Sequence, residues 1–483
     1  MASALPNSDY STFRVIQYRG FDVMPSVHIS PSFGLRRKAI SAGAWNLGAL
    51  VTSQLIRLGG NLVMTRLLMP EMFGIIAIAT TVLFVLHLLS DVGLRQNILQ
   101  SPRGDDPEFL NTLWTVQIVR GFVLFALTLF LAAAAWDSQA IDFWSHNSTY
   151  ASPQLPAVLA WTGLTAIIYG FQSTKVDLAV RAFQQKKVVI AEFASQVVGL
   201  LAMLVIGYFT HSIWSLVAAG LITALVSTLL GHYWFEGPSN SLRWERAALD
   251  ELVVFGRWIL LSSAVGVLSM QGDRIIFGGS MTVTEMGVYS IAVLILGAVQ
   301  TGVLKVVGAV ALPAFGEAAR TNDFDRLRRL YFKFKMLVDV ALLFLCGLFW
   351  VTSPLIISIL YDERYHDAGK MMAILSTSFF MMRYIVANQI WIALGLTKYQ
   401  AIDNIIRVVS LWVVVPVLLA IGGVEYAIWG VALHTLPTLV LVVYVNRRVG
   451  ILDIKRELMV LPMLVVGALC GELVLVVFRW LFG

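Results

Sequence analysis

The chain has 483 residues, of which 58% are hydrophobic and only 13% are charged, and its mean hydropathy is +0.78. Soluble globular proteins are about half apolar and about a quarter charged, so this composition excludes a soluble protein and indicates an integral membrane protein. The net charge is +6, but the basic residues stand in short loops between apolar runs, which is typical of cytoplasmic loops and argues against a nucleic-acid partner.

The first 35 residues differ from the rest of the chain. They are mixed in composition, contain three prolines and lack an apolar core of signal-peptide length, so we predict a flexible cytoplasmic tail at residues 1–35.

Thirteen apolar runs follow, and each approaches the roughly 20 residues that a membrane-spanning helix needs. We therefore predict an all-α integral membrane protein with thirteen transmembrane helices, within a range of about 12 to 14. The predicted spans are 40–62, 73–94, 113–135, 156–173, 188–208, 212–235, 257–279, 286–312, 335–359, 370–394, 402–421, 425–445 and 459–481.

Lysine and arginine are concentrated in alternate loops, as is expected when those loops are cytoplasmic. For example, the loop 318–334 holds five basic residues, whereas the loop 361–369 holds one. We therefore predict that the N-terminus and the loop 318–334 are cytoplasmic, and that the loop 361–369 and the C-terminus lie outside.

A weak internal repeat indicates two halves. Residues 71–79, EMFGIIAIA, return one residue shorter as EMGVYSIA at residues 285–292, and each copy opens an apolar helix. Repeats of this kind are typical of transporters whose two homologous halves face each other. We predict two pseudo-symmetric six-helix bundles joined by a linker. The predicted parts are a first lobe at 36–235, the linker at 236–256, a second lobe at 257–446 and an extra helix at 459–481.

Six basic residues lie inside the predicted spans and away from the ends of those spans. An arginine near the centre of such a helix costs about 2.5 to 3.5 kcal/mol, so most of them should face a watery cavity or a carboxylate. The six residues are Arg57, Arg120, Arg274, Lys305, Arg383 and Arg407.

Two helices carry polar residues at helical spacing, which predicts a polar stripe on an otherwise apolar surface. Each is the first helix of a half, where we expect the lobes to meet. The first stripe comprises Asn46, Ser53, Arg57 and Asn61, and the second comprises Ser262, Gly266, Ser269 and Asp273.

Several motifs resemble a known family. The runs are TRLLMPEMFGIIAIA, DVGLRQNILQ, GDRIIFGG followed by EMGVYSIA, and LIISILYDERYHDAG. In this order they resemble the polysaccharide-transport branch of the MOP superfamily, whose Wzx-type flippases move undecaprenyl-pyrophosphate-linked oligosaccharides across the bacterial inner membrane. The resemblance covers roughly residues 36–450.

The resemblance implies a MATE-like fold of two bundles around a central cavity, which works by alternating access. It implies a place in the biosynthesis and export of exopolysaccharide, capsule or O-antigen, with a polyprenyl-pyrophosphate-linked oligosaccharide and membrane lipids as partners. A polysaccharide polymerase and a chain-length regulator are further candidate partners. Members often have two extra C-terminal helices, whereas we predict one.

A pyrophosphate needs cations that stay charged, and arginine adds bidentate hydrogen bonds to it. We expect Arg57, Lys305 and Arg383 to form the main grip on this anion, with Arg120 and Arg274 in the wider cationic lining. A structural ion pair remains the alternative for each of them. Arg120 and Arg407 can instead snorkel toward the membrane surface.

The remaining candidate residues are neutral or acidic. His87 and Gln300 occupy similar places on the second and eighth helices and are candidates for contact with sugar hydroxyls. Asn46, Ser53 and Asn61 are the expected polar cavity lining. The candidates for a gate or for a site that couples transport to H+ or Na+ are Asp91, Asp273, Asp403 and Asn404.

Catalytic motifs are absent from the sequence. It holds no Walker loop, no H-E-x-x-H, no paired C-x-x-C and no nucleophile elbow, and its predicted outer loops are too short for a catalytic domain. We therefore predict a transporter and not an enzyme, with no cofactor other than a coupling ion and no metal site. The open alternatives are a MATE-like cation-coupled drug antiporter and a membrane polysaccharide polymerase.

Overall fold

The computed structural model describes residues 33–140, 147–321 and 323–482. This part of the chain is α-helical, with two short 3-10 turns and no strand. Residues Ala42–Gly483 form one compact unit, and the fold below is that of this unit. The all-α membrane architecture predicted from the sequence is confirmed.

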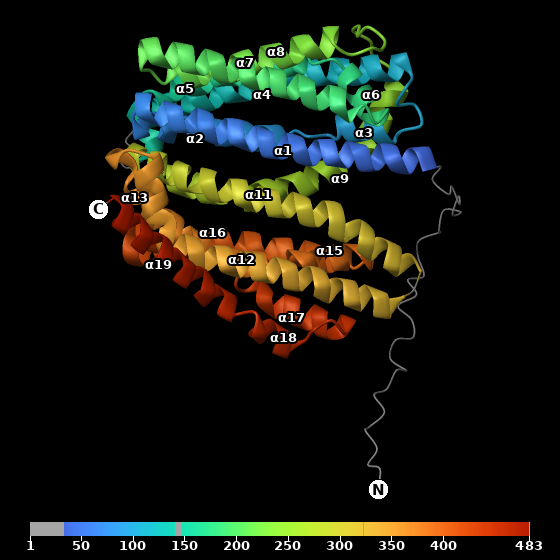
Figure 1. The fold of residues 1–483 in the computed structure, drawn as a ribbon. Coiled ribbons are helices and arrows are strands. Elements are labelled where there is room, and N and C mark those ends of the chain that lie inside the picture. Colours follow the sequence, from blue (N-terminus) through green and yellow to red (C-terminus); the bar gives the residue numbers. More distant parts are fainter. Residues whose placement is uncertain (1–32, 141–146, 322, 483) are drawn as a thin grey trace. The chain divides into compact units, whose positions relative to one another are not determined.

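The helices are arranged in two groups with one helix between them (Figure 1). We call α1 to α8 the first lobe and α10 to α19 the second lobe. The first lobe comprises α1 (Phe33–Leu67), α2 (Pro70–Leu89), α3 (Leu94–Gln100), α4 (Pro107–Ala140), α5 (Leu155–Gly170), α6 (Lys175–Arg181), α7 (Gln185–Thr210) and α8 (Trp214–Tyr233). The helix between the lobes is α9 (Arg246–Met270). The second lobe comprises α10 (Gly272–Gly278), α11 (Val283–Arg320), α12 (Phe324–Leu360), α13 (Asp367–Ser376), α14 (Phe379–Met382), α15 (Ile385–Ala393), α16 (Thr397–Leu433), α17 (Thr438–Val449), α18 (Ile454–Met459) and α19 (Pro462–Phe482).

Three of the predicted spans are interrupted. The span 257–279 breaks at Gln271, whose backbone leaves the helical region between α9 and α10. The span 370–394 is divided into α13, α14 and α15. The span 425–445 is interrupted between Leu433, where α16 ends, and Thr438, where α17 begins. Within α16, the backbone leaves the helical region at Gly422 and Gly423, between the predicted spans 402–421 and 425–445.

Within the described residues, nine helices are long and apolar enough to cross a membrane, or ten if the bent pair α5 and α6 is one span. The chain is therefore a multi-pass membrane protein. The total of thirteen spans stays a prediction, since one candidate segment, Thr397–Val449, covers two of the predicted spans.

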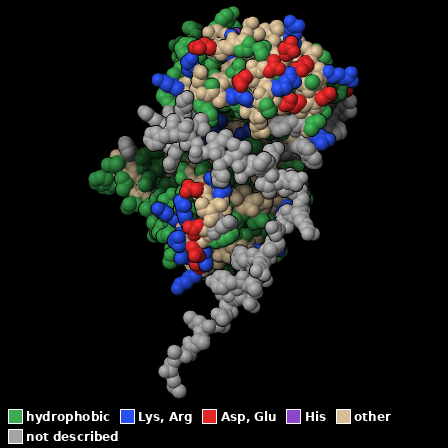
Figure 2. Space-filling model, turned by 90° about the vertical axis from the view of Figure 1, so that its right-hand side faces the viewer, with side chains coloured by type: hydrophobic (Ala, Val, Ile, Leu, Met, Phe, Trp, Pro, Cys, Tyr) green, Lys and Arg blue, Asp and Glu red, His purple; other side chains and the backbone are tan. Residues whose placement is uncertain are grey.

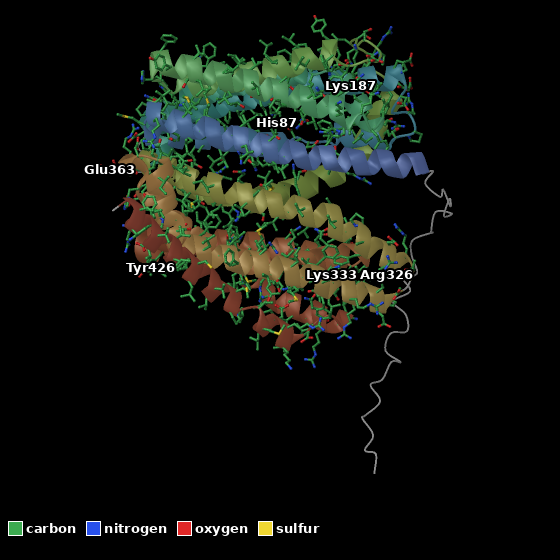
Figure 3. The ribbon with its side chains drawn as sticks, viewed as in Figure 1. His87, Lys187, Arg326, Lys333, Glu363 and Tyr426 are labelled. Atoms are coloured by element: carbon green, nitrogen blue, oxygen red, sulfur yellow. The ribbon has the colours of Figure 1, made fainter. Side chains whose placement is uncertain are left out.

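Residues that the sequence assigns to opposite membrane faces lie at opposite ends of the helices. Figure 3 shows Lys187, Arg326 and Lys333 at one end and Glu363 and Tyr426 at the other. We call the first the basic end. Figure 2 views this end and shows charged side chains on both lobes. The alternation of basic loops thus corresponds to a real separation in space.

The two copies of the repeat pack against each other. A Cβ at Gly74 would overlap the carbonyl oxygen of Val283, and a Cβ at Gly287 would overlap that of Pro70. Glycine therefore allows α2 and α11 to cross at backbone distance at the end opposite the basic end. The second copy also begins with a capping box, in which Thr282 and Glu285 exchange hydrogen bonds at the start of α11.

The predicted linker 236–256 is not entirely a loop, because α9 begins at Arg246. The first turns of α9 pack on the first lobe, where Ala248 and Leu252 join a buried cluster with Leu94 and Phe109. The later part of α9 contacts the second lobe, and the Trp412 indole donates a hydrogen bond to the Leu268 carbonyl oxygen. The helix therefore connects the two lobes along much of its length.

Candidate functional site

A chamber of about 480 Å³ lies inside the first lobe, toward the basic end. We call it the first-lobe chamber. Helices α2, α4, α5, α7 and α8 surround it, and its lining combines polar and charged side chains. The polar lining residues include His87, Asp91, Arg95, Gln117, Arg120, Tyr169, Asp177, Glu192 and Ser227.

Three candidate residues meet in this chamber, but not as an ion pair. The Arg120 guanidinium donates to the Ser90 hydroxyl at 3.0 Å and to the His87 carbonyl oxygen at 2.6 Å. A carboxylate oxygen of Asp91 accepts the backbone N–H of Gly93 at 2.9 Å. The salt bridge weighed for Asp91 and Arg120 is not among those of the described residues, because each group satisfies itself locally.

A second cavity, of about 590 Å³, lies between α1, α7 and α11. We call it the interlobe cavity. Its lining includes Ser53 and Lys305 from the candidate set, together with Glu192 and Gln196. The Ser53 hydroxyl donates to the Gln196 side-chain oxygen at 2.7 Å. Lys305 is exposed and has no ion-pair partner among the described residues.

Arg57 and Arg274 also lack an acidic partner within the described part of the chain. They lie close enough for their charges to repel each other. Arg274 donates to the Gln271 side-chain oxygen at 3.2 Å, and Arg57 is exposed. The side-chain amide of Asn61 is already engaged within its own helix, because it donates a hydrogen bond to the Arg57 carbonyl oxygen at 2.7 Å.

A third cavity, of about 290 Å³, lies in the second lobe and contains Gln300. The Gln300 amide donates to the Ser378 hydroxyl at 3.2 Å. Arg407 also lines the cavity and is paired with Asp403, whose oxygen lies 2.8 Å from its Nε. Asp403 is fully buried, whereas the neighbouring Asn404 is exposed, so the two do not converge on one cation.

Arg383 does not lie in any of these cavities. It is 3% exposed and contacts the carboxylates of Glu457 at 3.1 Å and Asp339 at 3.6 Å. Lys335 joins this buried cluster, 2.5 Å from Asp339 and 3.3 Å from Glu457. The expected place of Arg383 beside Arg57 and Lys305 is therefore wrong. The break between α14 and α15 turns its side chain toward α12 and α18, where it has the structural ion pair that was the alternative.

The second polar stripe is not continuous. Asp273 follows the break at Gln271 and accepts a hydrogen bond from the Tyr289 hydroxyl at 2.5 Å. Ser269 lines the second-lobe cavity instead. The side chains of Asn46 and Ser262 lie outside the described residues.

Sequence reasoning missed Glu192, which lines both the first-lobe chamber and the interlobe cavity. It is the only charged residue in the predicted span 188–208. The test that selected the six basic residues, a charge inside an apolar span, would have found it had it been applied to every acid. Arg95 and Asp177, an ion pair at 3.4 Å in the chamber, lie in loops and short helices and gave no such signal.

The lobes are tied together at the end opposite the basic end. Arg364 donates to the Thr65 carbonyl oxygen at 3.0 Å, and the Thr284 hydroxyl donates to Glu71 at 2.7 Å. The Phe73 and Tyr365 rings pack edge to face with centroids 6.2 Å apart. Within the second lobe, the hydrogen-bonded Arg364 guanidinium lowers the pKa of Asp362 below its ordinary value.

Comparison with known sequences identifies relatives. A family model described as polysaccharide biosynthesis protein matches residues 63–370, which is more than half of the chain. The lipopolysaccharide biosynthesis protein WzxC of Escherichia coli (strain K12) is 21% identical over 309 residues, which are 63% of this chain and 60% of that protein. The chain spans about three fifths of the length of the curated relatives it matches.

Two solved structures resemble the fold at a TM-score of 0.64 each. One is a MATE family multidrug resistance transporter of the MOP superfamily in an inward-facing conformation, 13% identical, with 82% of this chain and 94% of that chain covered. The other is the lipid II flippase MurJ in an inward closed conformation, 11% identical, with 90% and 97% covered. At these identities the likeness concerns the fold alone, and it confirms the MOP-type architecture. Together with the match over more than half of its length, this shows that the chain belongs to the polysaccharide biosynthesis protein family.

Proposed function

We propose that this protein is a flippase of the bacterial inner membrane that moves polyprenyl-pyrophosphate-linked oligosaccharides for polysaccharide biosynthesis. The observation that carries the proposal is the set of three cations near the lobe interface, Arg57, Arg274 and Lys305. None of them has an ion-pair partner among the described residues. The family match and the name of the MurJ flippase agree with this choice of substrate class.

Unpaired cations at membrane depth are costly unless a ligand or water solvates them. A pyrophosphate supplies several anionic oxygens, and guanidinium groups bind such oxygens through two parallel hydrogen bonds. We therefore assign the grip to Arg57, Arg274 and Lys305. Arg383 and Arg407 are left out because carboxylates already neutralise them.

The distribution of cavities supports alternating access. The first-lobe chamber opens near the basic end, and the lobes are tied at the other end by Arg364, Thr284 and the crossing of α2 and α11. We propose that the anionic head group enters from the basic end while the lipid tail stays in the bilayer. Separation of the lobes at the tied end then releases the head group on the other side of the membrane.

The orientation of the protein is part of this proposal, with the N-terminus and the basic end in the cytoplasm. Single cysteines at Thr321 and His366, both exposed, test it with a membrane-impermeant thiol reagent on intact cells. We expect labelling at His366 only. Labelling at Thr321 from outside would reverse the orientation.

The proposal also includes a coupling ion and partner proteins, each named by its class. We retain H+ or Na+ as the coupling ion, and Asp91 is the candidate carboxylate that faces the first-lobe chamber. A polymerase and a chain-length regulator would act on the exported saccharide. A drug antiporter, the alternative transporter, would favour an acidic cavity, whereas the interlobe cavity is lined by Lys305 as well as Glu192, and Arg57 and Arg274 lie close enough for their charges to repel each other.

Complementation of polysaccharide export in a flippase-null strain tests the function. Arg57→Ala, Arg274→Ala and Lys305→Ala should each lose most export, normalised to the protein inserted in the membrane. Arg243→Ala, at an exposed loop position, is the matched control and should export normally. Full export by all three variants would contradict the proposal that these cations bind the pyrophosphate.

The site of accumulation distinguishes a flippase from a polymerase. In cells that lack the protein, lipid-linked saccharide should accumulate on the inner leaflet of the membrane, where spheroplasts keep it from added glycosidases. Accumulation of single repeat units on the outer leaflet would instead favour a polymerase and overturn the proposal.

A further inference from the structure

The first-lobe chamber and the interlobe cavity meet at one residue. Helix α7 separates them, with Val188 and Ala191 facing the chamber and Val189 and Phe193 facing the interlobe cavity. Glu192 lines both spaces. A ligand with two chemically different parts can therefore place one part on each side of this carboxylate.

The two spaces differ in their charges. In the chamber, Arg95 is paired with Asp177 at 3.4 Å, and Arg120 is bound to the Ser90 hydroxyl and the His87 carbonyl oxygen while Asp91 lies nearby. Positive and negative groups thus balance locally, which gives no advantage to a ligand with several negative charges. Between the lobes, Lys305 lines the cavity together with Glu192 and forms no ion pair with any described residue, while Arg57 and Arg274 lie close enough for their positive charges to repel each other.

The chamber also offers hydrogen-bonding groups that the protein does not use. The His87 ring, the Tyr169 hydroxyl, the Ser227 hydroxyl and the Glu192 carboxylate have no hydrogen-bond partner within the described part of the chain. They include donors and acceptors. A neutral ligand with many hydroxyl groups needs this mixture, since each hydroxyl both donates and accepts.

We propose that the first-lobe chamber is a saccharide subsite, which holds the sugar nearest the pyrophosphate while Lys305, Arg57 and Arg274 hold the phosphates. This inference rests on the proposed function. The chamber volume of about 480 Å³ falls within the range of about 300 to 1,000 Å³ that small-molecule sites occupy, which suits a short saccharide.

Glu192 has a defined role in this arrangement. Its carboxylate repels phosphate and accepts hydrogen bonds from sugar hydroxyls, so it marks the boundary between the two parts of the ligand. The first sugar is bonded directly to the pyrophosphate, and a boundary shared by adjoining cavities matches that connection. Reversal of the ligand would place the phosphates in the chamber, whose cations Arg95 and Arg120 already interact with Asp177 and Asp91.

Cysteine protection measures occupancy of each space separately. In a background with Cys346→Ala and Cys470→Ala, Ser227→Cys reports on the chamber and Ala309→Cys reports on the interlobe cavity. The full-length protein is placed in nanodiscs and treated with a small maleimide. The probes are undecaprenyl diphosphate without sugar and undecaprenyl-diphosphate-linked saccharide extracted from the host membrane.

We expect the sugar-free lipid to slow labelling only at Ala309→Cys, and the sugar-bearing lipid to slow labelling at both positions by at least about fivefold. Glu192→Gln and Tyr169→Phe should each reduce protection at Ser227→Cys while protection at Ala309→Cys persists. Tyr169→Phe preserves the ring and its packing, so it still tests the subsite if Glu192→Gln proves unstable.

The outcomes separate the two proposals. Protection of Ala309→Cys by both lipids without protection of Ser227→Cys by the sugar-bearing lipid would overturn the subsite and leave the flippase proposal intact. Equal protection of Ser227→Cys by the sugar-free lipid would also overturn it. Protection at neither position would count against the proposed function itself.

Discussion

Two pairs of helices approach each other closely through glycine, and they differ in what surrounds the contact. At the crossing of α2 and α11, Gly74 and Gly287 face carbonyl oxygens of the other helix. At the crossing of α12 and α19, a Cβ at Gly347 would overlap the Leu464 carbonyl oxygen, and one at Gly467 would overlap that of Phe344. The first crossing joins the two lobes, and the second lies within one lobe.

The charges near each crossing make the difference. Beside α12, the buried cluster of Lys335, Asp339, Arg383 and Glu457 joins α12 to α18, which leads into α19. Removal of one partner from a buried ion pair costs about 3 to 5 kcal/mol. Near the crossing of α2 and α11, the ties are hydrogen bonds of partly exposed groups such as Thr284, each worth about 1 kcal/mol. The same glycine contact can therefore be permanent in one place and reversible in another.

The largest expected effect concerns the buried cluster. Glu457→Gln removes the carboxylate that contacts both Lys335 and Arg383, and should lower the free energy of unfolding by about 3 kcal/mol, the lower end of the range because its side chain is 20% exposed. The measurement is thermal unfolding in detergent. Glu472→Gln, an exposed position on α19, is the control and should leave the melting temperature unchanged. Equal melting temperatures for both variants would contradict the conclusion that the ion pairs of Glu457 hold α18 against the rest of the second lobe.

The next prediction compares equivalent substitutions at the two crossings. Gly467→Ala should destabilise the protein by about 1 to 3 kcal/mol, because the added methyl group forces α12 and α19 apart in every state. Gly287→Ala should affect stability less and transport more, because it disfavours only the state in which α2 and α11 are in contact. Thermal unfolding and polysaccharide export, each measured on both variants, check this pattern.

The reverse pattern would contradict the distinction between a permanent crossing of α12 and α19 and a reversible crossing of α2 and α11. If Gly287→Ala unfolds the protein while Gly467→Ala spares its stability, the interlobe crossing is the permanent contact and the proposed separation of the lobes fails.

The sequence indicated the two related halves better than the pairing of the charged residues. The repeat at 71–79 and 285–292 indicated two related halves, and in the structure its copies meet. The six intramembrane cations were also visible in the sequence. The pairing of Arg383 was not, because its nearest acidic partner, Glu457, lies on a short helix outside every predicted span.

Local helix breaks were the second limit. The break at Gln271 has no proline, so periodicity alone predicted one continuous stripe from Ser262 to Asp273. Tertiary contacts decide it instead, among them the hydrogen bond of Tyr289 to Asp273 and the packing of Trp412 beside Gly272. Such contacts join residues far apart in sequence, which a helical repeat does not encode.

The smallest expected effect concerns the end at which the lobes are tied. It tests whether the tied state and the separated state have similar free energies. Thr284→Val removes the hydroxyl that donates to Glu71 at 2.7 Å and nearly preserves the shape of the side chain. Loss of about 1 kcal/mol from the state in which the lobes touch at this end changes the ratio of the two states about fivefold. The population of the state in which the lobes are separated at this end should therefore rise. The readout is maleimide labelling of Ala309→Cys in the cysteine-free background, which should slow as the interlobe cavity closes toward the basic end. Ser358→Ala is the matched control, because among the described residues the partner of the Ser358 hydroxyl is the Leu355 carbonyl oxygen of its own helix. If Thr284→Val and Ser358→Ala label at the same rate, the tie contributes nothing to the balance between states, and the α2 and α11 crossing must hold the lobes closed by packing alone.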